Sequence, residues 1–197
     1  MKKEKFASLC MIATIVSFLG FIIENVWLLL RYGVINNRNM YLPLLLGYGL
    51  AVIVIYFVLG TPTHPKFLGF TLPVKRKIFA ISLYFLFVSL FVMVGECGLG
   101  IFVEKVMGFV WWDYTALPLN LTRYTSVPTT IAFSTLISLF MGLVFMPLYR
   151  RFCSLKWKGF PMLAGLLVLL MTVDFIHSAI YMYQNHTTLL LWSISFR

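Results

Sequence analysis

The chain has 197 residues, of which 61% are hydrophobic and only 11% are charged. A soluble domain carries about 25% charged residues, so the composition predicts an all-α integral membrane protein with a single transmembrane domain over residues 1–197. The net charge of +10 does not indicate a nucleic-acid partner, because the basic residues lie at the ends of apolar runs, where membrane topology uses them.

Five apolar runs are long enough to span a bilayer, which takes about 20 helical residues. They predict a bundle of about five transmembrane helices, at roughly 6–30, 41–60, 78–103, 127–149 and 159–183. The first run begins with "MKKEKF" and resembles a signal peptide, but its apolar part is too long and no small-x-small cleavage site follows, so we expect a retained helix. The tail 187–197 is too short to cross and is expected to lie at the membrane interface.

The positive charges predict the orientation of these helices. With the N-terminus inside, eleven of the 16 Lys and Arg residues fall in inner segments and five in outer ones. The positive-inside rule therefore favours an N-in, C-out topology, and we expect the protein in a bacterial cell membrane. The cysteines at 10, 97 and 153 form neither a disulfide framework nor a metal-ligand spacing, so no metal site is predicted and no cofactor is indicated.

Five of the six acidic residues fall in or above the expected outer half of the membrane. Glu24, Glu96 and Asp174 lie at similar depth in three different helices, Glu24 about 9 Å below the outer end of its helix. Ionisable groups inside a membrane cost several kcal/mol and normally face a partner or a polar cavity. Any one of these carboxylates could simply form a hydrogen bond across helices, but together they predict an outward-facing pocket.

Helical spacing places further polar and aromatic residues beside these carboxylates. The residues that share one face of the fifth helix are Asp174, His177, Ser178 and Tyr181. Trp27 and Arg31 lie on the face of Glu24 in the first helix, and Glu104 lies two turns beyond Glu96 in the third. Taken alone, His177 is better explained as a packing residue.

The stretch "VWWDYTALPLNL" at 110–121 is expected to form a re-entrant or lid-like outer loop between the third and fourth helices, because Pro118 interrupts any helix there. Trp112 and Tyr114 would anchor the loop at the headgroups while Asp113 and Asn120 turn toward the pocket. An interfacial aromatic belt is the alternative explanation for the aromatic residues.

The candidate site residues fall into two groups. The acid–base candidates are Glu24, Glu96, Asp174 and His177, and the ligand-binding candidates are Trp27, Asn37, Arg38, Glu104, Trp112, Asp113, Tyr114, Asn120, Ser178 and Tyr181. We expect Arg38, in the first outer loop, to lie within salt-bridge reach of at least one of the acids.

The order of several polar and turn residues resembles a known family. The matching positions are Glu24, Asn37-Arg38, Pro43, Tyr48-Gly49, Glu96, Glu104, "WDY" at 112–114, "LPLN" ending at Asn120, Pro147, Asp174 and Ser178. This pattern resembles the putative ABC-transporter type IV family of small membrane proteins, also called CmpB-like, over most of the chain. The family pattern has Gly where this chain has Asn39, and Gly-Arg where this chain has "TRY" at 122–124, so ligand preference at the mouth of the pocket is expected to differ.

Three functions are compatible with these features. The resemblance implies a permease-type or ligand-binding subunit whose outer pocket takes a small or lipid-like ligand, in contact with membrane lipid and with a second copy or a partner transporter subunit. No P-loop is present in the sequence, so any ATPase would be another chain. The alternative is an intramembrane acid–base enzyme acting on a lipid or isoprenoid substrate. A third possibility is an accessory protein whose pocket holds a partner helix.

Overall fold

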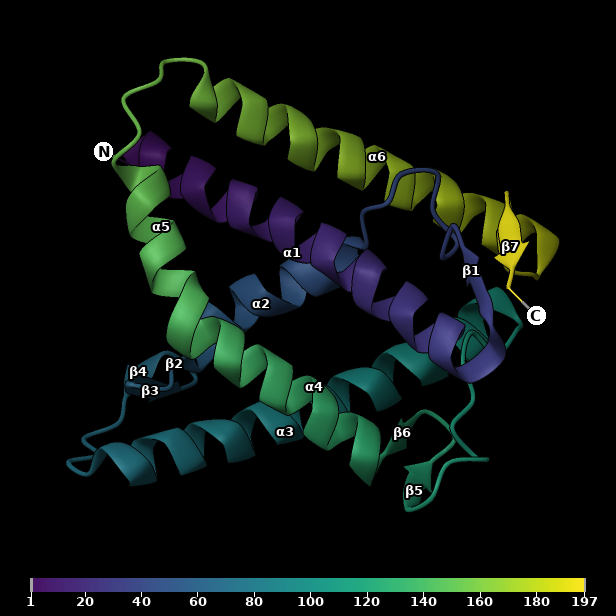
Figure 1. Cartoon of the computed structure of the whole chain (residues 1–197), viewed down its shortest axis with the longest axis horizontal. Helices are drawn as coiled ribbons and strands as arrows, with labels where there is room; N and C mark the ends of the chain where they lie inside the picture. Colours follow the sequence, from purple (N-terminus) through teal and green to yellow (C-terminus); the bar gives the residue numbers. More distant parts are fainter. Residues whose placement is uncertain (1, 197) are drawn as a thin grey trace. The chain divides into compact units, whose positions relative to one another are not determined.

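The structure, a computed structural model, describes residues 2–196 and is mainly helical (Figure 1). The helices are α1 (Lys2–Tyr32), α2 (Leu46–Val58), α3 (Lys77–Met107), α4 (Val127–Leu139), the π-helical segment η1 (Phe140–Phe145), α5 (Met146–Cys153) and α6 (Phe160–Asn185). The strands are β1 (Val34–Asn36), β2 (Gly60–Thr61), β3 (His64–Phe67), β4 (Phe70–Thr71), β5 (Asn120–Thr122), β6 (Thr125–Ser126) and β7 (Ser193–Ser195). The predicted all-α membrane class is confirmed.

Within residues 2–196, four helical stretches are long and apolar enough to cross a membrane. They are Lys3–Tyr32, Lys77–Met107, Val127–Cys153 and Phe160–Asn185, the third of which joins α4, η1 and α5. The second predicted span, 41–60, forms only the 13-residue helix α2. Residues 41–45 are not helical, and Pro43 in this stretch has no amide hydrogen to donate to a helix.

The described part of the chain divides into two compact units. The first combines Met1–Ile53 with Leu148–Arg197, and the second is Val54–Pro147. Each unit is described by itself below, and the single transmembrane domain expected from the sequence stays a prediction.

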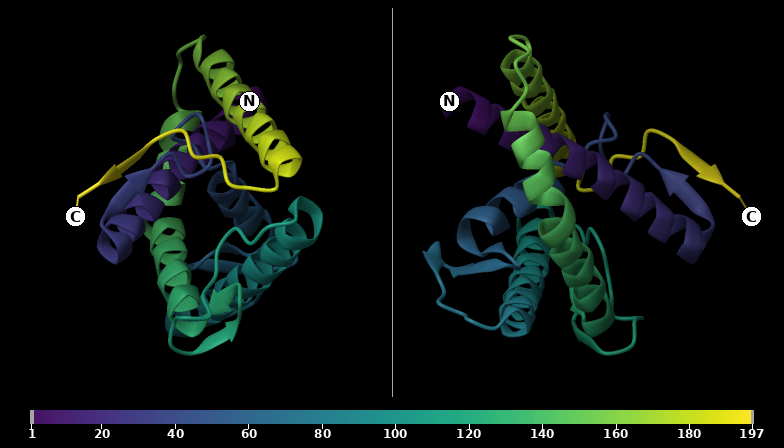
Figure 2. Two further views of the ribbon diagram at one scale, coloured as in Figure 1. Left: turned by 90° about the vertical axis from the view of Figure 1, so that its right-hand side faces the viewer. Right: turned by 60° about the vertical axis from the view of Figure 1, so that its left-hand side comes forward.

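In the first unit, α1 and α6 lie side by side and run in the same direction (Figures 1 and 2). Near the start of both helices, Ala7 packs in a buried cluster with Phe160 and Ala164. Beyond their C-terminal ends, β1 and β7 pair antiparallel, with Asn36 opposite Ser193. The small residues at the first contact let the two backbones approach closely.

The second predicted span is shorter than the four long helices. The 13 residues of α2 rise about 20 Å, whereas the hydrocarbon core of a bilayer is about 30 Å thick. The five crossings expected from hydropathy therefore stay a prediction.

Glycines let α2 approach α1 within the first unit. A Cβ atom on Gly49 would lie 2.4 Å from the carbonyl oxygen of Ala13, and one on Gly20 would lie 2.5 Å from the ring of Tyr48. Neither distance is compatible with a side chain. This contact brings Tyr48 against α1, where it matters for the site described below.

The second unit is built on α3 and α4, which pack together and are joined by residues 108–126. This connection is a loop that ends in the β5–β6 hairpin, as expected for the segment around Pro118. Gly100 of α3 leaves space for the ring of Tyr124, which a Cβ atom at position 100 would meet at 2.3 Å. The strands β2, β3 and β4 form a small antiparallel meander that precedes α3.

Candidate functional site

In the first unit, three polar side chains meet near the C-terminal end of α1. Arg38 donates from Nη2 to Oε2 of Glu24 at 2.7 Å, and the hydroxyl of Tyr48 donates to Oε1 at 2.5 Å. The side chains of Arg38 and Glu24 are 23% and 22% exposed, so the pair is neither fully buried nor solvated. The expected contact of Arg38 with an acid is confirmed. We call Glu24, Arg38 and Tyr48 the outer triad, because the topology expected from the positive charges places this end of α1 at the outer surface.

The loop that carries Arg38 is held in an unusual conformation. Arg38 and Asn39 both have left-handed backbones, with φ of 50° and 65°. The Oδ1 atom of Asn36 accepts from the amide of Arg38 at 2.9 Å. This conformation is uncommon for residues other than glycine and has to be held by the surrounding contacts.

Asn37 fastens the same loop to the C-terminal tail. Its buried side chain donates to the carbonyl oxygens of Met40 and Leu189 and accepts from the amide of Leu191. Asn37 therefore lies in the scaffold behind the triad, where its amide holds main-chain groups. The tail beyond α6, expected at the interface, packs on the β1 loop through these contacts and through β7.

Asp174 also holds main chain. Its Oδ1 and Oδ2 atoms accept from the amides of Tyr41 and Leu42, both at 2.9 Å, and Ser178 donates to Oδ1 at 3.5 Å. The residue is only 6% exposed. Unwound backbone at membrane depth must have its polar groups satisfied within the protein, and Asp174 does this for the residues that precede α2.

The other predicted residues of α1 and α6 lie outside the outer triad. The ring of His177 packs edge-on against Tyr41, with 5.1 Å between the centroids. Trp27 and Tyr181 are 43% and 38% exposed. Glu24 and Asp174 bind the same loop between β1 and α2. Glu24 pairs with Arg38, and Asp174 accepts hydrogen bonds from the amides of residues 41 and 42.

The second unit contains a separate polar network at the end of α3. Arg123 binds Oε1 of Glu104 at 3.2 Å and Oδ2 of Asp113 at 2.8 Å, while the hydroxyl of Tyr124 donates to Oε2 of Glu104. Hydrogen bonds from Thr115 and then Arg123 lower the pKa of Asp113 to about 2. The hydrogen bond to Glu104 raises the pKa of Tyr124. These contacts tie the loop 108–126 to α3.

Glu96, about two helical turns before Glu104 in α3, also contacts the β5–β6 hairpin. The hydroxyl of Thr125 donates to Oε2 of Glu96 at 2.7 Å and lies 3.1 Å from the hydroxyl of Thr130. Ser126 and Thr129 then begin α4 with a reciprocal capping box. Glu96 and Glu104 thus share one face of α3, as predicted, and both engage the β5–β6 hairpin.

The aromatic and amide residues of the loop have local roles. The indole of Trp112 donates to the carbonyl oxygen of Tyr124 at 2.9 Å, and the amide of Tyr114 donates to that of Arg123 at 2.7 Å. Asn120 is exposed in β5. The predicted turn of Asp113 and Asn120 into a pocket shared with Glu24 and Asp174 joins residues of different units and stays a prediction.

The comparisons with known proteins add a family. The sequence model described as "Putative ABC-transporter type IV" matches residues 11–179. The chain belongs to this family. The matched stretch of the type IV chain contains the outer triad, Asp174, and the two carboxylates that contact the β5–β6 hairpin, Glu96 and Glu104. Neither a curated protein nor a solved structure matches the chain. Family and fold together make this a multi-pass, transporter-like membrane protein.

Several residues that complete these networks were not predicted as site residues. Tyr48 belongs to the outer triad, and Arg123, Tyr124 and Thr125 bind the carboxylates of α3. In the sequence, Tyr48 is indicated only by its match to the family pattern, together with Gly49. The run of Arg, Tyr and Thr at 123–125 is polar and follows a long apolar helix, a signal that could have identified it. Among residues 2–196, no group of three or more His, Cys, Asp or Glu is placed to hold a metal ion.

Proposed function

We propose that this type IV chain is a permease-type membrane subunit that binds a small or lipid-like ligand with a charged group at the outer triad. The observation that carries the proposal is the Glu24–Arg38 pair, which is partly exposed and is presented by a loop with two left-handed residues. Backbone strain of this kind costs on the order of 1–3 kcal/mol per residue and clusters at functional sites. A loop whose only role was to neutralise the charge of Glu24 would not require this backbone strain.

The chemistry of the triad favours an amphiphilic or zwitterionic ligand. Arg38 has five donors in a planar fork and uses Nη2 on Glu24, so a ligand carboxylate or phosphate can share the guanidinium. A cationic group of the ligand would compete for Glu24. The exposed Trp27 on the same helix would contact the apolar part of such a ligand.

Binding is favoured over acid–base catalysis because two acid–base candidates have other roles. Both carboxylate oxygens of Asp174 accept main-chain amides, and the ring of His177 packs against Tyr41. The hydrogen bond from Tyr48 to Glu24 favours the second candidate function, an intramembrane enzyme in which this pair moves a proton on a lipid or isoprenoid substrate. Glu96 would take part in this proton transfer only if it shares one outward-facing pocket with Glu24, as expected from the sequence.

The family also implies partners. A transporter subunit without a P-loop would depend on an ATPase from another chain, and a homodimer or a second subunit would complete a path across the membrane. We propose such an assembly in a bacterial cell membrane, with the C-terminal ends of α1 and α6 at its outer surface.

The binding proposal is tested on the purified full chain. Thermal unfolding is measured with glycine betaine, glycerol 3-phosphate, a fatty acid and a lysophospholipid, each in turn. A bound compound should stabilise the wild type by about 2.7 kcal/mol when its concentration is about 100 times its Kd. Arg38→Gln and Glu24→Gln should lose this response, while Arg31→Gln, an exposed change at the end of α1, should keep it. An unchanged response in Arg38→Gln would overturn the proposal.

A further inference from the structure

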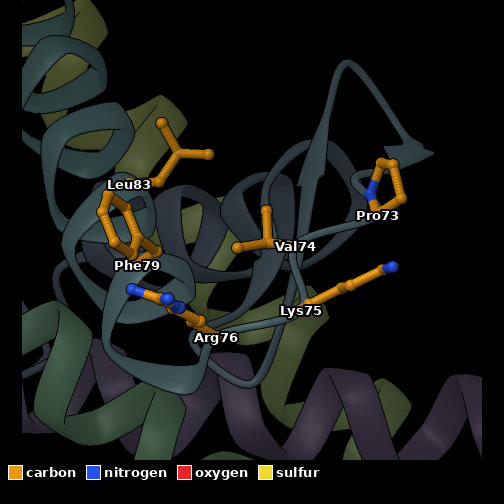
Figure 3. A pocket seen from close by; sticks show the side chains of 6 residues that line it. All are labelled: Pro73, Val74, Lys75, Arg76, Phe79 and Leu83. Atoms are coloured by element: carbon orange, nitrogen blue, oxygen red, sulfur yellow. The ribbon is translucent and has the colours of Figure 1, made fainter.

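A groove beside the start of α3 combines positive charge with apolar walls. It has a volume of about 410 Å³ and is lined by Pro73, Val74, Lys75, Arg76, Phe79 and Leu83. Figure 3 shows Phe79 and Leu83 on α3 and Arg76 just before its start, while Lys75 extends to the other side. We call this the basic groove. It lies within the second unit and contains none of the outer-site residues.

A second hollow continues the same face of α3. It has a volume of about 350 Å³ and lies between the β2–β4 meander and the middle of α3, where Phe67 packs 5.2 Å from Phe87. At about 100° per residue, the helical positions Phe79, Leu83, Phe87, Leu90 and Val94 fall within an arc of roughly 80°, and Arg76 immediately precedes the helix. One helix face therefore leads from a cationic end into an apolar track.

The cationic end is not neutralised by any carboxylate that the structure describes. Among residues 2–196, Lys75, Arg76 and Lys77 form no ion pair with a carboxylate. The first turn of α3 contains no acidic residue, and no side chain caps its amides. Three adjacent cations beside free helical amides favour a phosphate group, which both features stabilise.

We propose that the basic groove binds an anionic phospholipid, with the phosphate at Arg76, beside the adjacent charge of Lys75, and one acyl chain along α3. The dimensions fit, because the chains of one leaflet span about 15 Å, the rise of about ten helical residues. A chain that starts at Arg76 thus ends near Phe87, where the second hollow begins. A zwitterionic head group carries its own cation and gains less from this site, and free phosphate gains nothing from the apolar walls.

The expected topology places this site at the inner surface, where the positive-inside rule puts Lys75–Lys77. It is therefore a second lipid site, independent of ligand binding at the outer triad. An anionic lipid held here would fix the start of α3 at the inner surface.

The test compares binding of dioleoyl phosphatidylglycerol and dioleoyl phosphatidylcholine to the purified full chain by native mass spectrometry. Phosphatidylglycerol should bind more tightly. Lys75→Gln with Arg76→Gln should weaken its binding by about fivefold per charge removed, or roughly 25-fold. The matched control is Lys156→Gln with Lys158→Gln, which removes two exposed basic charges elsewhere and should leave binding unchanged.

Leu83→Trp fills the groove without changing charge and should weaken phosphatidylglycerol binding as well. This variant decides the question if the double charge variant fails to fold. Equal binding of the two lipids, or equal loss in the control pair, would show only annular lipid and would overturn the proposal. Competition by millimolar inorganic phosphate would identify a simple anion site and would overturn the acyl-chain part.

Discussion

Replacing Asp174 by Asn tests whether its carboxylate serves the backbone. Both oxygens accept main-chain amides, from Tyr41 and Leu42, at 2.9 Å. An asparagine offers one oxygen and one NH₂ group, so one of the two amides would face a donor.

The magnitude follows from the burial of the site. A hydrogen bond to a charged group contributes about 1.5–3 kcal/mol, and a buried amide left unsatisfied costs about 1–3 kcal/mol. We expect Asp174→Asn to lower the free energy of unfolding by about 2–3 kcal/mol, which in a chain of this size lowers Tm by roughly 4–12 °C. The loop around Arg38 should also loosen, so trypsin should cleave after Arg38 faster than in the wild type.

The assay is tryptophan fluorescence during heating in detergent, with limited trypsin digestion of the same samples. Glu96→Gln is the matched control, because the hydroxyl of Thr125 can either donate or accept and so tolerates an amide at position 96. Its Tm should stay close to that of the wild type. If Asp174→Asn unfolds at the wild-type temperature and resists trypsin equally, the carboxylate does not hold the loop and the reasoning is refuted.

Three further predictions concern helix contacts and the outer loop. Gly49→Ala should destabilise the chain by about 1–3 kcal/mol in thermal unfolding because the new Cβ atom meets the backbone of α1, whereas Gly47→Ala, with open space, should not. Gly100→Ala should do the same through the hairpin tyrosine ring, with Gly98→Ala as its control. Because the pKa of Asp113 is lowered to about 2 from 3.8, its contribution to loop stability should be complete above about pH 4 and lost as the pH falls toward 2. Loop tryptophan fluorescence should report this loss in the wild type but not in Asp113→Asn.

The membrane class and most helix positions could be predicted from the sequence because hydropathy is a local property. The third helix was expected at 78–103 and is Lys77–Met107, and the fifth was expected at 159–183 and is Phe160–Asn185. The second was expected at 41–60, yet only Leu46–Val58 is helical. Its unwound start depends on Asp174, a residue 133 positions away, which no local pattern reveals.

The candidate site was predicted less completely, for the same reason. The pairing of Arg38 with an acid follows from charge and topology. The partners of Glu96 and Glu104, in contrast, depend on how the β5–β6 hairpin packs against α3. Asp174 is a candidate on sequence grounds because an ionisable carboxyl group inside a membrane is energetically costly. This free-energy cost does not distinguish a reactive carboxyl group from one that accepts hydrogen bonds from main-chain amides. Only the two amide contacts of Asp174 make that distinction.

The central claim is that the triad near the C-terminal end of α1 faces outward, and thiol labelling tests it most directly. In a chain with Cys10, Cys97 and Cys153 replaced by Ser, single cysteines are placed at Asn39 and Lys156. In intact cells, a membrane-impermeant maleimide should label position 39 at once, and position 156 only after the membrane is permeabilised. Labelling of position 156 from outside, with position 39 protected until permeabilisation, would contradict the account and place the triad at the inner surface.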